Sequence, residues 1–179
     1  MLTDNCSSMM KSRISIRKFE NVTIPDRDIE DIIEIGTKAP SAGNCQPWRV
    51  VIVKDAATRE KLAEAAWGQG FVARAPVILA VCAVPAESKE KYSERGETLY
   101  VLQDTAALAT SLLLGAHFKG YGACWVGAFD EETVTSILNV PAEMRPVALI
   151  PIGIPDGSVT KKRKRRPLSE IMVRECFAK

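Results

Sequence analysis

The sequence contains one histidine, His117, and its 5 cysteines form no Cys-x-x-Cys pair. A single imidazole excludes a multi-histidine metal site and disfavours a Ser-His-Asp triad, so we expect His117 to be a packed or surface residue. Neither a P-loop motif nor a Gly-x-Gly-x-x-Gly turn after a strand is present, so these two nucleotide-binding folds are unsupported. An odd number of cysteines cannot all pair within one chain, and free thiols in a reducing compartment are expected.

The length of 179 residues is that of one domain, and we expect residues 1–179 to form a single folded unit. A composition of 46% hydrophobic and 26% charged residues excludes disorder as the main state. The first residues, MLTDNCSSMM, lack the apolar segment of a signal peptide, and no apolar run approaches the ~20 residues of a membrane span. The sequence therefore predicts a cytoplasmic protein without a membrane partner.

The charge is unevenly distributed along the chain. The formal net charge is +2, but six consecutive basic residues occupy 161–166, and without them it would be −4 (2 minus 6). Such a run is typical of a solvated tail, a nucleic-acid patch or a targeting signal. Because the segment PLSEIM follows directly, a docked phosphate anchor is an equally good interpretation.

Apolar patterning predicts a small sheet between helices. Short apolar runs at Trp48–Val53, Pro76–Val84 and Val147–Ile152 predict buried strands. Isoleucines at helical spacing after Pro25 predict a helix at Pro25–Lys38, and further helices are expected at 56–66 and 130–138. This alternation indicates an α+β or α/β domain.

The longest helical pattern runs from Glu97 to Lys119. Its second half, TAALATSLLLGAHFKG, is apolar on nearly all sides, which predicts a helix buried all round. A chain of this size rarely surrounds one helix completely, so we infer that a second subunit covers part of it.

A cluster near the start of the chain could bind an anion. In an extended segment, period-two spacing places Arg13, Ser15 and Arg17 on one side. Two guanidinium groups and a hydroxyl suit a phosphate or another oxygen-rich anion. An exposed basic edge is the simpler interpretation of the spacing alone.

Two further stretches have ligand-binding composition. Residues 39–48 read APSAGNCQPW, which is long for a helix-to-strand junction and carries Ser41, Asn44 and Gln46 together. Residues 120–129 read GYGACWVGAF, where three glycines permit close backbone approach and Trp125 offers an aromatic wall. A tight turn with a packed tryptophan would explain the second stretch equally well.

Taken together and in this order, the clusters resemble the FMN-dependent nitroreductase family. The resemblance rests on RISIRKF, APSAGNCQPWRVVIV, APVILAV, the block QDTAALATSLLLGAHFKGYGACWVGAF, GIPDG and KRKRRPLSEI, and covers nearly the whole chain. It implies an α+β nitroreductase-like fold, with a small mixed central sheet surrounded by helices and a long buried helix at a dimer interface. It also implies a homodimer with two FMN molecules between the subunits.

The resemblance assigns roles by position. Arg13, Ser15 and Arg17 would hold the phosphate, the ribityl chain and the N1/O2 edge of the flavin. Gln69 would bond the pyrimidine side of the ring. No second basic residue is in register there, so Arg17 would be the main positive charge near N1. The remaining positions are Pro40, Ser41, Ala42 and Asn44 from the other subunit, Trp125, Val126, Gly127 and Ala128 near N5, and Arg163 and Arg165 on the phosphate.

The implied activity is hydride transfer from NADH or NADPH through flavin N5 to nitroaromatic, quinone or similar acceptors, in a ping-pong sequence. It requires no side-chain acid or base and no metal, so no catalytic side chain is predicted. One alternative keeps the fold but performs reductive dehalogenation or flavin fragmentation. A less favoured one is a nucleic-acid-binding module that uses residues 161–166. A third is a flavin-binding protein without turnover.

Overall fold

The computed structural model describes residues 2–158 and 163–177, with side chains from Ser7 onward. Lys161 and Lys162 of the basic run lie outside the described residues. The helices are α1 (Leu2–Ser12), α2 (Asp26–Thr37), α3 (Ala56–Ala65), α4 (Phe71–Arg74), α5 (Pro85–Arg95), α6 (Val101–Phe118), α7 (Glu131–Leu138) and α8 (Leu168–Ile171), with a 3-10 turn at Ala42–Asn44 and a π turn at Gly96–Tyr100. The strands are β1 (Trp48–Val53), β2 (Val77–Ala83), β3 (Gly122–Ala123) and β4 (Arg145–Gly153).

The four strands form one sheet in the order β1-β2-β4-β3, and all their ladders are antiparallel. The expected mixed character is limited to an isolated parallel bridge between Ser15 and Ala123. The prediction that Trp48–Val53 is a buried strand was wrong in part. Its bounds are correct, but it lies at the sheet edge, where only Trp48 and Val53 are buried. Its β-branched composition does not distinguish an edge strand from a central one.

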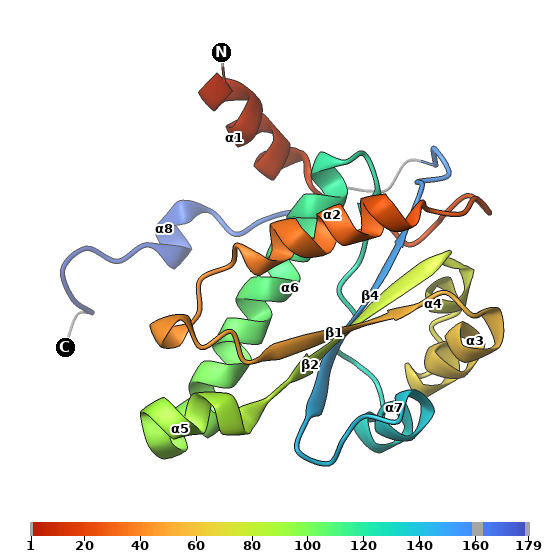
Figure 1. Cartoon of the computed structure of the whole chain (residues 1–179). Helices are drawn as coiled ribbons and strands as arrows, with labels where there is room; N and C mark the ends of the chain where they lie inside the picture. The colour runs from red at the N-terminus through yellow and green to blue at the C-terminus, as the bar shows by residue number, and fades with distance from the viewer. Residues whose placement is uncertain (1, 159–162, 178–179) are drawn as a thin grey trace.

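Helices cover both faces of this sheet (Figure 1). Successive residues of β2 point to opposite faces, so that Leu79 packs with α2 and α6 while Ile78 packs with α3, α4 and α7. Every residue of β2 is buried, which explains why its sequence is continuously apolar. The fold is α+β, which is one of the two classes that the pattern allows and the one that the resemblance implies.

The long helix differs from its prediction in two ways. It begins at Val101 after a π turn, and a separate charged helix, α5, precedes it and was missed. Within one chain the apolar second half of the pattern is only partly buried, because Thr110 is exposed and Phe118 is 66% exposed, so its cover by a second subunit stays a prediction. By length and composition the continuous stretch Pro85–Phe118 could span a membrane, but half of its most apolar window is buried inside this structure.

A polar cluster joins the end of α6 to α2. Tyr121 Oη donates to Asp28 Oδ2 at 2.6 Å, and Lys119 Nζ lies 2.7 Å from Asp28 Oδ1 and 2.6 Å from Asp31 Oδ2. Burial, and then the bond to Asp28, raises the pKa of Tyr121 to about 12. Hydrogen bonds from Lys119 and Tyr121 lower the pKa of Asp28.

This cluster predicts a loss of stability in alkali. The pKa of Tyr121 is raised above the ~10 of an unfolded tyrosine, so its stabilisation is complete below about pH 10 and is lost as the pH rises toward about 12. The urea midpoint of the wild type should therefore fall more between about pH 8 and about pH 11 than that of Tyr121→Phe. An equal fall in both proteins would contradict this role of the phenol.

Candidate functional site

The N-terminal segment 13–17 lies against the strand that follows α6. Ile16 N donates to Ala123 O at 3.0 Å, next to the bridge between Ser15 and Ala123. The approach requires glycine at position 122, since a Cβ there would lie 2.7 Å from Ile16 Cβ. Segments more than 100 positions apart are therefore joined by backbone contact, which fixes the direction of the side chains on either side.

The bridge between Ser15 and Ala123 places the segment of Arg13, Ser15 and Arg17 beside buried Cys124, whose Sγ lies 3.5 Å from Trp125 O. Burial raises the pKa of the Cys124 thiol, while the charge of Arg17, a hydrogen bond from Ser15 and the charge of Arg13 act in the opposite direction. Among the described side chains, no carboxylate forms an ion pair with either arginine. Two guanidinium groups without a described anionic partner, beside a hydroxyl, suit a phosphate.

The segment 125–128 continues from this cluster. Gln69 Nε2 donates to Ala66 O at 2.9 Å and to Ala128 O at 3.2 Å, which places Gln69 beside the segment. Trp125 is 37% exposed, and Gly127 and Ala128 are exposed as well. These residues can contact the face or edge of a planar ligand.

Two neighbouring residues limit the contacts that are available. Val126 is buried, and its backbone N–H and C=O both pair with Leu149 at 2.9 Å. It can therefore offer a ligand van der Waals contact but no backbone hydrogen bond. The guanidinium carbon of Arg17 lies 5.6 Å from the centroid of the Phe71 ring, which orients this arginine.

The loop of Pro40–Asn44 lies at the other end of α6. Ala42 N donates to Asp104 Oδ1 at 3.0 Å, whereas the hydrogen bond of 2.9 Å between Ser12 and His117 lies next to Arg13. Asp104 and His117 are 13 positions apart on one helix, and at about 1.5 Å per residue the two ends are roughly 20 Å apart. One chain therefore does not bring this loop to the arginine cluster.

The loop holds its own shape partly by internal contacts. Gly43, Asn44 and Gln46 have positive φ angles of 53°, 57° and 51°. Ser41 Oγ accepts from Gln46 N at 3.0 Å, and Gln46 Nε2 donates to Asn44 O at 3.4 Å. Gln46 thus supports the loop backbone, while Asn44 is exposed.

The two basic residues predicted to close on a phosphate stand apart from the cluster. Arg163 and Arg165 are exposed and form no hydrogen bond or ion pair with other described residues. In Figure 1 the segment that carries them leads away from the sheet toward α8. Their role stays a prediction.

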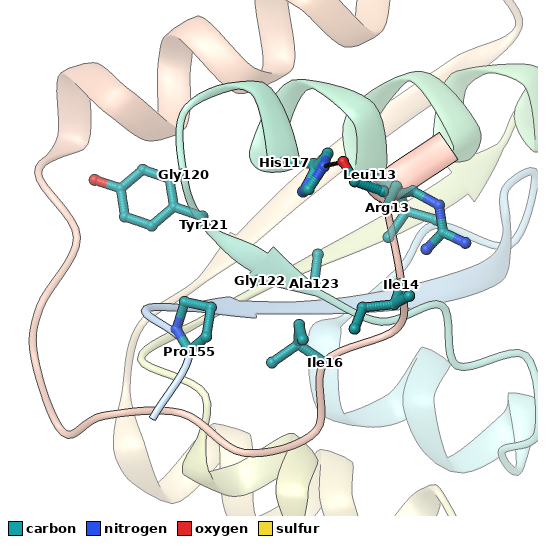
Figure 2. A pocket seen from close by; sticks show the side chains of 11 residues that line it. Arg13, Ile14, Ile16, Leu113, His117, Gly120, Tyr121, Gly122, Ala123 and Pro155 are labelled. Atoms are coloured by element: carbon teal, nitrogen blue, oxygen red, sulfur yellow. Dashed lines mark hydrogen bonds between the residues drawn. The ribbon is translucent and has the colours of Figure 1, made fainter. Parts of the chain in front are cut away.

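A cavity of about 290 Å³ lies beside the cluster, between the last turn of α6 and β3 (Figure 2). Arg13 and His117 stand at one end of it, and Tyr121 and Pro155 at the other. Its lining between these ends is mostly apolar, with Ile14, Ile16 and Leu113. The cavity thus suits an apolar group better than the charged end of a nucleotide.

Sequence reasoning missed three residues that shape the site: Phe71, Cys124 and Asp104. The first two become visible only when distant segments are packed together. Asp104 carried a signal, because it is an isolated acid in an otherwise apolar helical stretch.

The sequence profile of the nitroreductase family matches residues 10–73 and 67–154. The protein belongs to the nitroreductase family. It is 32% identical over 156 residues to an Archaeoglobus fulgidus protein with the working name NADH dehydrogenase/NAD(P)H nitroreductase, with 85% of this chain and 86% of that one covered. It is also 32% identical over 170 residues to the NADH dehydrogenase of Thermus thermophilus, with 80% and 83% covered.

Solved structures confirm the fold. A nitroreductase family protein from Clostridium novyi superimposes with a TM-score of 0.76 at 30% identity, covering 84% of this chain and 85% of that one. Membership of the family supports an NAD(P)H-dependent oxidoreductase. Weaker relatives, 26% and 27% identical, are named iodotyrosine deiodinase in Haliscomenobacter hydrossis and 5,6-dimethylbenzimidazole synthase in Rhodospirillum rubrum.

Proposed function

We propose that this nitroreductase family protein is an FMN-dependent oxidoreductase that passes hydride from NADH or NADPH to nitroaromatic, quinone or similar acceptors. The observation that carries the proposal is the pairing of the segment of Arg13, Ser15 and Arg17 with Ala123, directly before the 124–128 segment. The cluster combines positive charge, a hydroxyl and an exposed aromatic side chain, which are the groups that a phosphorylated flavin needs.

The described residues fit FMN. Bound FMN would supply the hydride-accepting and hydride-donating centre at its N5 atom. Arg13 and Ser15 would hold the phosphate and ribityl end, and Arg17, oriented by Phe71, would supply positive charge at the N1 side of the ring. Gln69 and the Trp125–Ala128 segment would position the ring and limit access of water. No proton transfer by a side chain is needed.

We further propose that two copies of the chain form the site. The Pro40–Asn44 loop lies roughly 20 Å along α6 from the arginines, which is too far to serve the same flavin within one chain. The C-terminal segment carries the exposed apolar side chains Leu168, Ile171 and Phe177, and part of α6 is exposed as well. A homodimer would cover these surfaces and deliver the loop, with Arg163 and Arg165, to the partner's flavin.

The proposal predicts that the purified protein is yellow or turns yellow with FMN, and that FMN raises its melting temperature. A colourless protein that neither binds added FMN nor gains thermal stability from it would exclude the assignment. If it instead bound nucleic acid with affinity falling steeply with salt, residues 161–166 would mark a binding module.

Assays distinguish the proposed reductase activity from the two alternative flavin reactions, reductive dehalogenation and flavin fragmentation. Dehalogenation or flavin fragmentation would appear as product formation without nitroaromatic or quinone turnover. The insertion between β2 and α6 consists only of α5 and the π turn, which offers little extra lid for a specialised substrate. We therefore favour a reductase with broad acceptors.

A further inference from the structure

Asp104 is the only carboxylate among the buried side chains that the structure describes, with 5% of its surface exposed. It occupies the same stripe of α6 as Leu108 and Leu112, which are four and eight positions further on. That stripe packs on α2 so closely that a Cβ at Gly36 would lie 2.5 Å from Leu112 Cδ2. Because α2 ends at Thr37, the stripe meets the Pro40–Asn44 loop where Asp104 stands.

The surroundings of Asp104 do not favour a carboxylate for stability. Its Oδ1 accepts the N–H of Ala42 at 3.0 Å, but its buried Oδ2 has no partner among the described residues. Burial raises the pKa of Asp104, and the Ala42 hydrogen bond opposes this shift. An apolar residue of similar size would avoid the desolvation of an unpaired oxygen. The acid therefore calls for an explanation other than core packing.

The loop that Asp104 contacts needs to be held from outside. Asn44 and Gln46 have left-handed backbone angles, which are uncommon for residues other than glycine and are better tolerated by asparagine than by glutamine. Apart from the bonds within the loop, Lys91 Nζ donates to Gly43 O at 3.1 Å from an exposed position. The bond to Asp104 is part-buried and connects the loop to the central helix across 62 positions of sequence. Of these two hydrogen bonds from outside the loop, the one to Asp104 is thus better shielded from solvent.

We propose that Asp104 is a positioning residue of the flavin site. By accepting the Ala42 N–H it holds the loop in the shape that presents Ser41 and Asn44 to the ring. This rests on the proposed function, since contact of the loop with flavin is itself part of that proposal. The role is to pre-organise the site, and Asp104 itself does not touch the flavin.

The decisive variants separate positioning from stability. Asp104→Leu continues the apolar stripe, so its melting temperature without flavin should equal or exceed that of the wild type. Its affinity for FMN should nevertheless fall about tenfold, equivalent to about 1.4 kcal/mol. Asp104→Asn retains an acceptor oxygen and should recover most of the affinity. The matched control is Thr105→Val, because Thr105 is the neighbouring residue and is also buried. Its hydroxyl donates only to its own helix, to Val101 O at 2.8 Å and Leu102 O at 3.1 Å.

Ala42→Pro provides a second route should Asp104→Leu fold poorly. It removes only the N–H at the first position of the 3-10 turn, where proline is tolerated. Ala42→Pro should lower FMN affinity about tenfold, and in its background changing Asp104 to Ala should have no further effect.

A readout without flavin keeps this inference distinct from the proposed function. Amide exchange at Ala42 in the flavin-free protein should accelerate at least about tenfold in Asp104→Leu and stay unchanged in Thr105→Val. Unchanged exchange at Ala42, or wild-type FMN affinity in Asp104→Leu, would overturn the role of Asp104. A fall in both the flavin-free melting temperature and the FMN affinity of Asp104→Leu would also overturn it. Failure of the wild type to bind FMN would instead remove the proposed function and leave the exchange result to decide whether Asp104 holds the loop.

Discussion

Replacing both Arg13 and Arg17 with glutamine is expected to lower the affinity for FMN by about a hundredfold or more. A hydrogen bond to a charged group contributes about 1.5–3 kcal/mol, so two of them correspond to a factor of roughly 10² to 10⁴. Quenching of FMN fluorescence by the flavin-free protein measures the affinity. Both arginines belong to the segment that pairs with Ala123 within one chain, so the effect does not depend on how the subunits associate.

Riboflavin, which lacks the phosphate, distinguishes the role of Arg13 at the phosphate from that of Arg17 at the flavin ring. Arg13→Gln should weaken FMN binding and leave riboflavin binding unchanged, whereas Arg17→Gln should weaken both. Lys18→Gln is the matched control, because it removes the same charge from the next position, where the lysine acts on Asp156 instead. Wild-type FMN affinity in the double variant, or an equal loss in Lys18→Gln, would rule out the arginine cluster as the anchor.

Mixing two defective proteins is expected to restore flavin binding. One carries Arg13→Gln and Arg17→Gln, and the other carries Ser41→Ala and Asn44→Gly, where glycine tolerates the φ of 57° at position 44. If each site takes its arginines from one subunit and its loop from the other, a heterodimer has one intact site and one doubly damaged site. Random pairing then restores about a quarter of the wild-type sites, and the isolated heterodimer should bind FMN at about half of its sites.

The subunits are refolded together or coexpressed with two different tags, and the heterodimer is isolated before titration with FMN. The two homodimers, treated in the same way, are the controls. A site contained in a single chain would give no gain on mixing. That outcome would place the Pro40–Asn44 loop outside the flavin site.

The sequence predicts secondary structure best where nearly every residue of an element is buried. β2 is central and apolar throughout, and its predicted bounds differ from the observed ones by one residue at each end. α5 was missed because only Ser88 of its eleven residues is buried, which leaves no apolar periodicity to detect. The exposure of β1 depends on its place at the sheet edge, which is a property of the topology and not of its own sequence.

The candidate site also contains one part that local sequence predicts and another that depends on the tertiary fold. The arginine cluster is a local pattern in an extended segment, and its shared direction follows from period-two geometry. Its neighbours, Cys124 and Phe71, come from segments that only the tertiary fold brings near. The bond between Asp104 and Ala42 depends on where α2 ends relative to α6, and no spacing rule contains that information. Arg163 and Arg165 have no partner among the described residues, so their predicted contact with the phosphate stays a prediction.

The central claim is tested most directly by anaerobic titration of the FMN-loaded protein with NADH or NADPH, followed by visible absorbance. We expect about one equivalent of reductant per flavin to bleach the spectrum, and a nitroaromatic or quinone added afterwards to restore it. A flavin spectrum that neither nucleotide bleaches, or a protein that binds no flavin at all, would contradict the account.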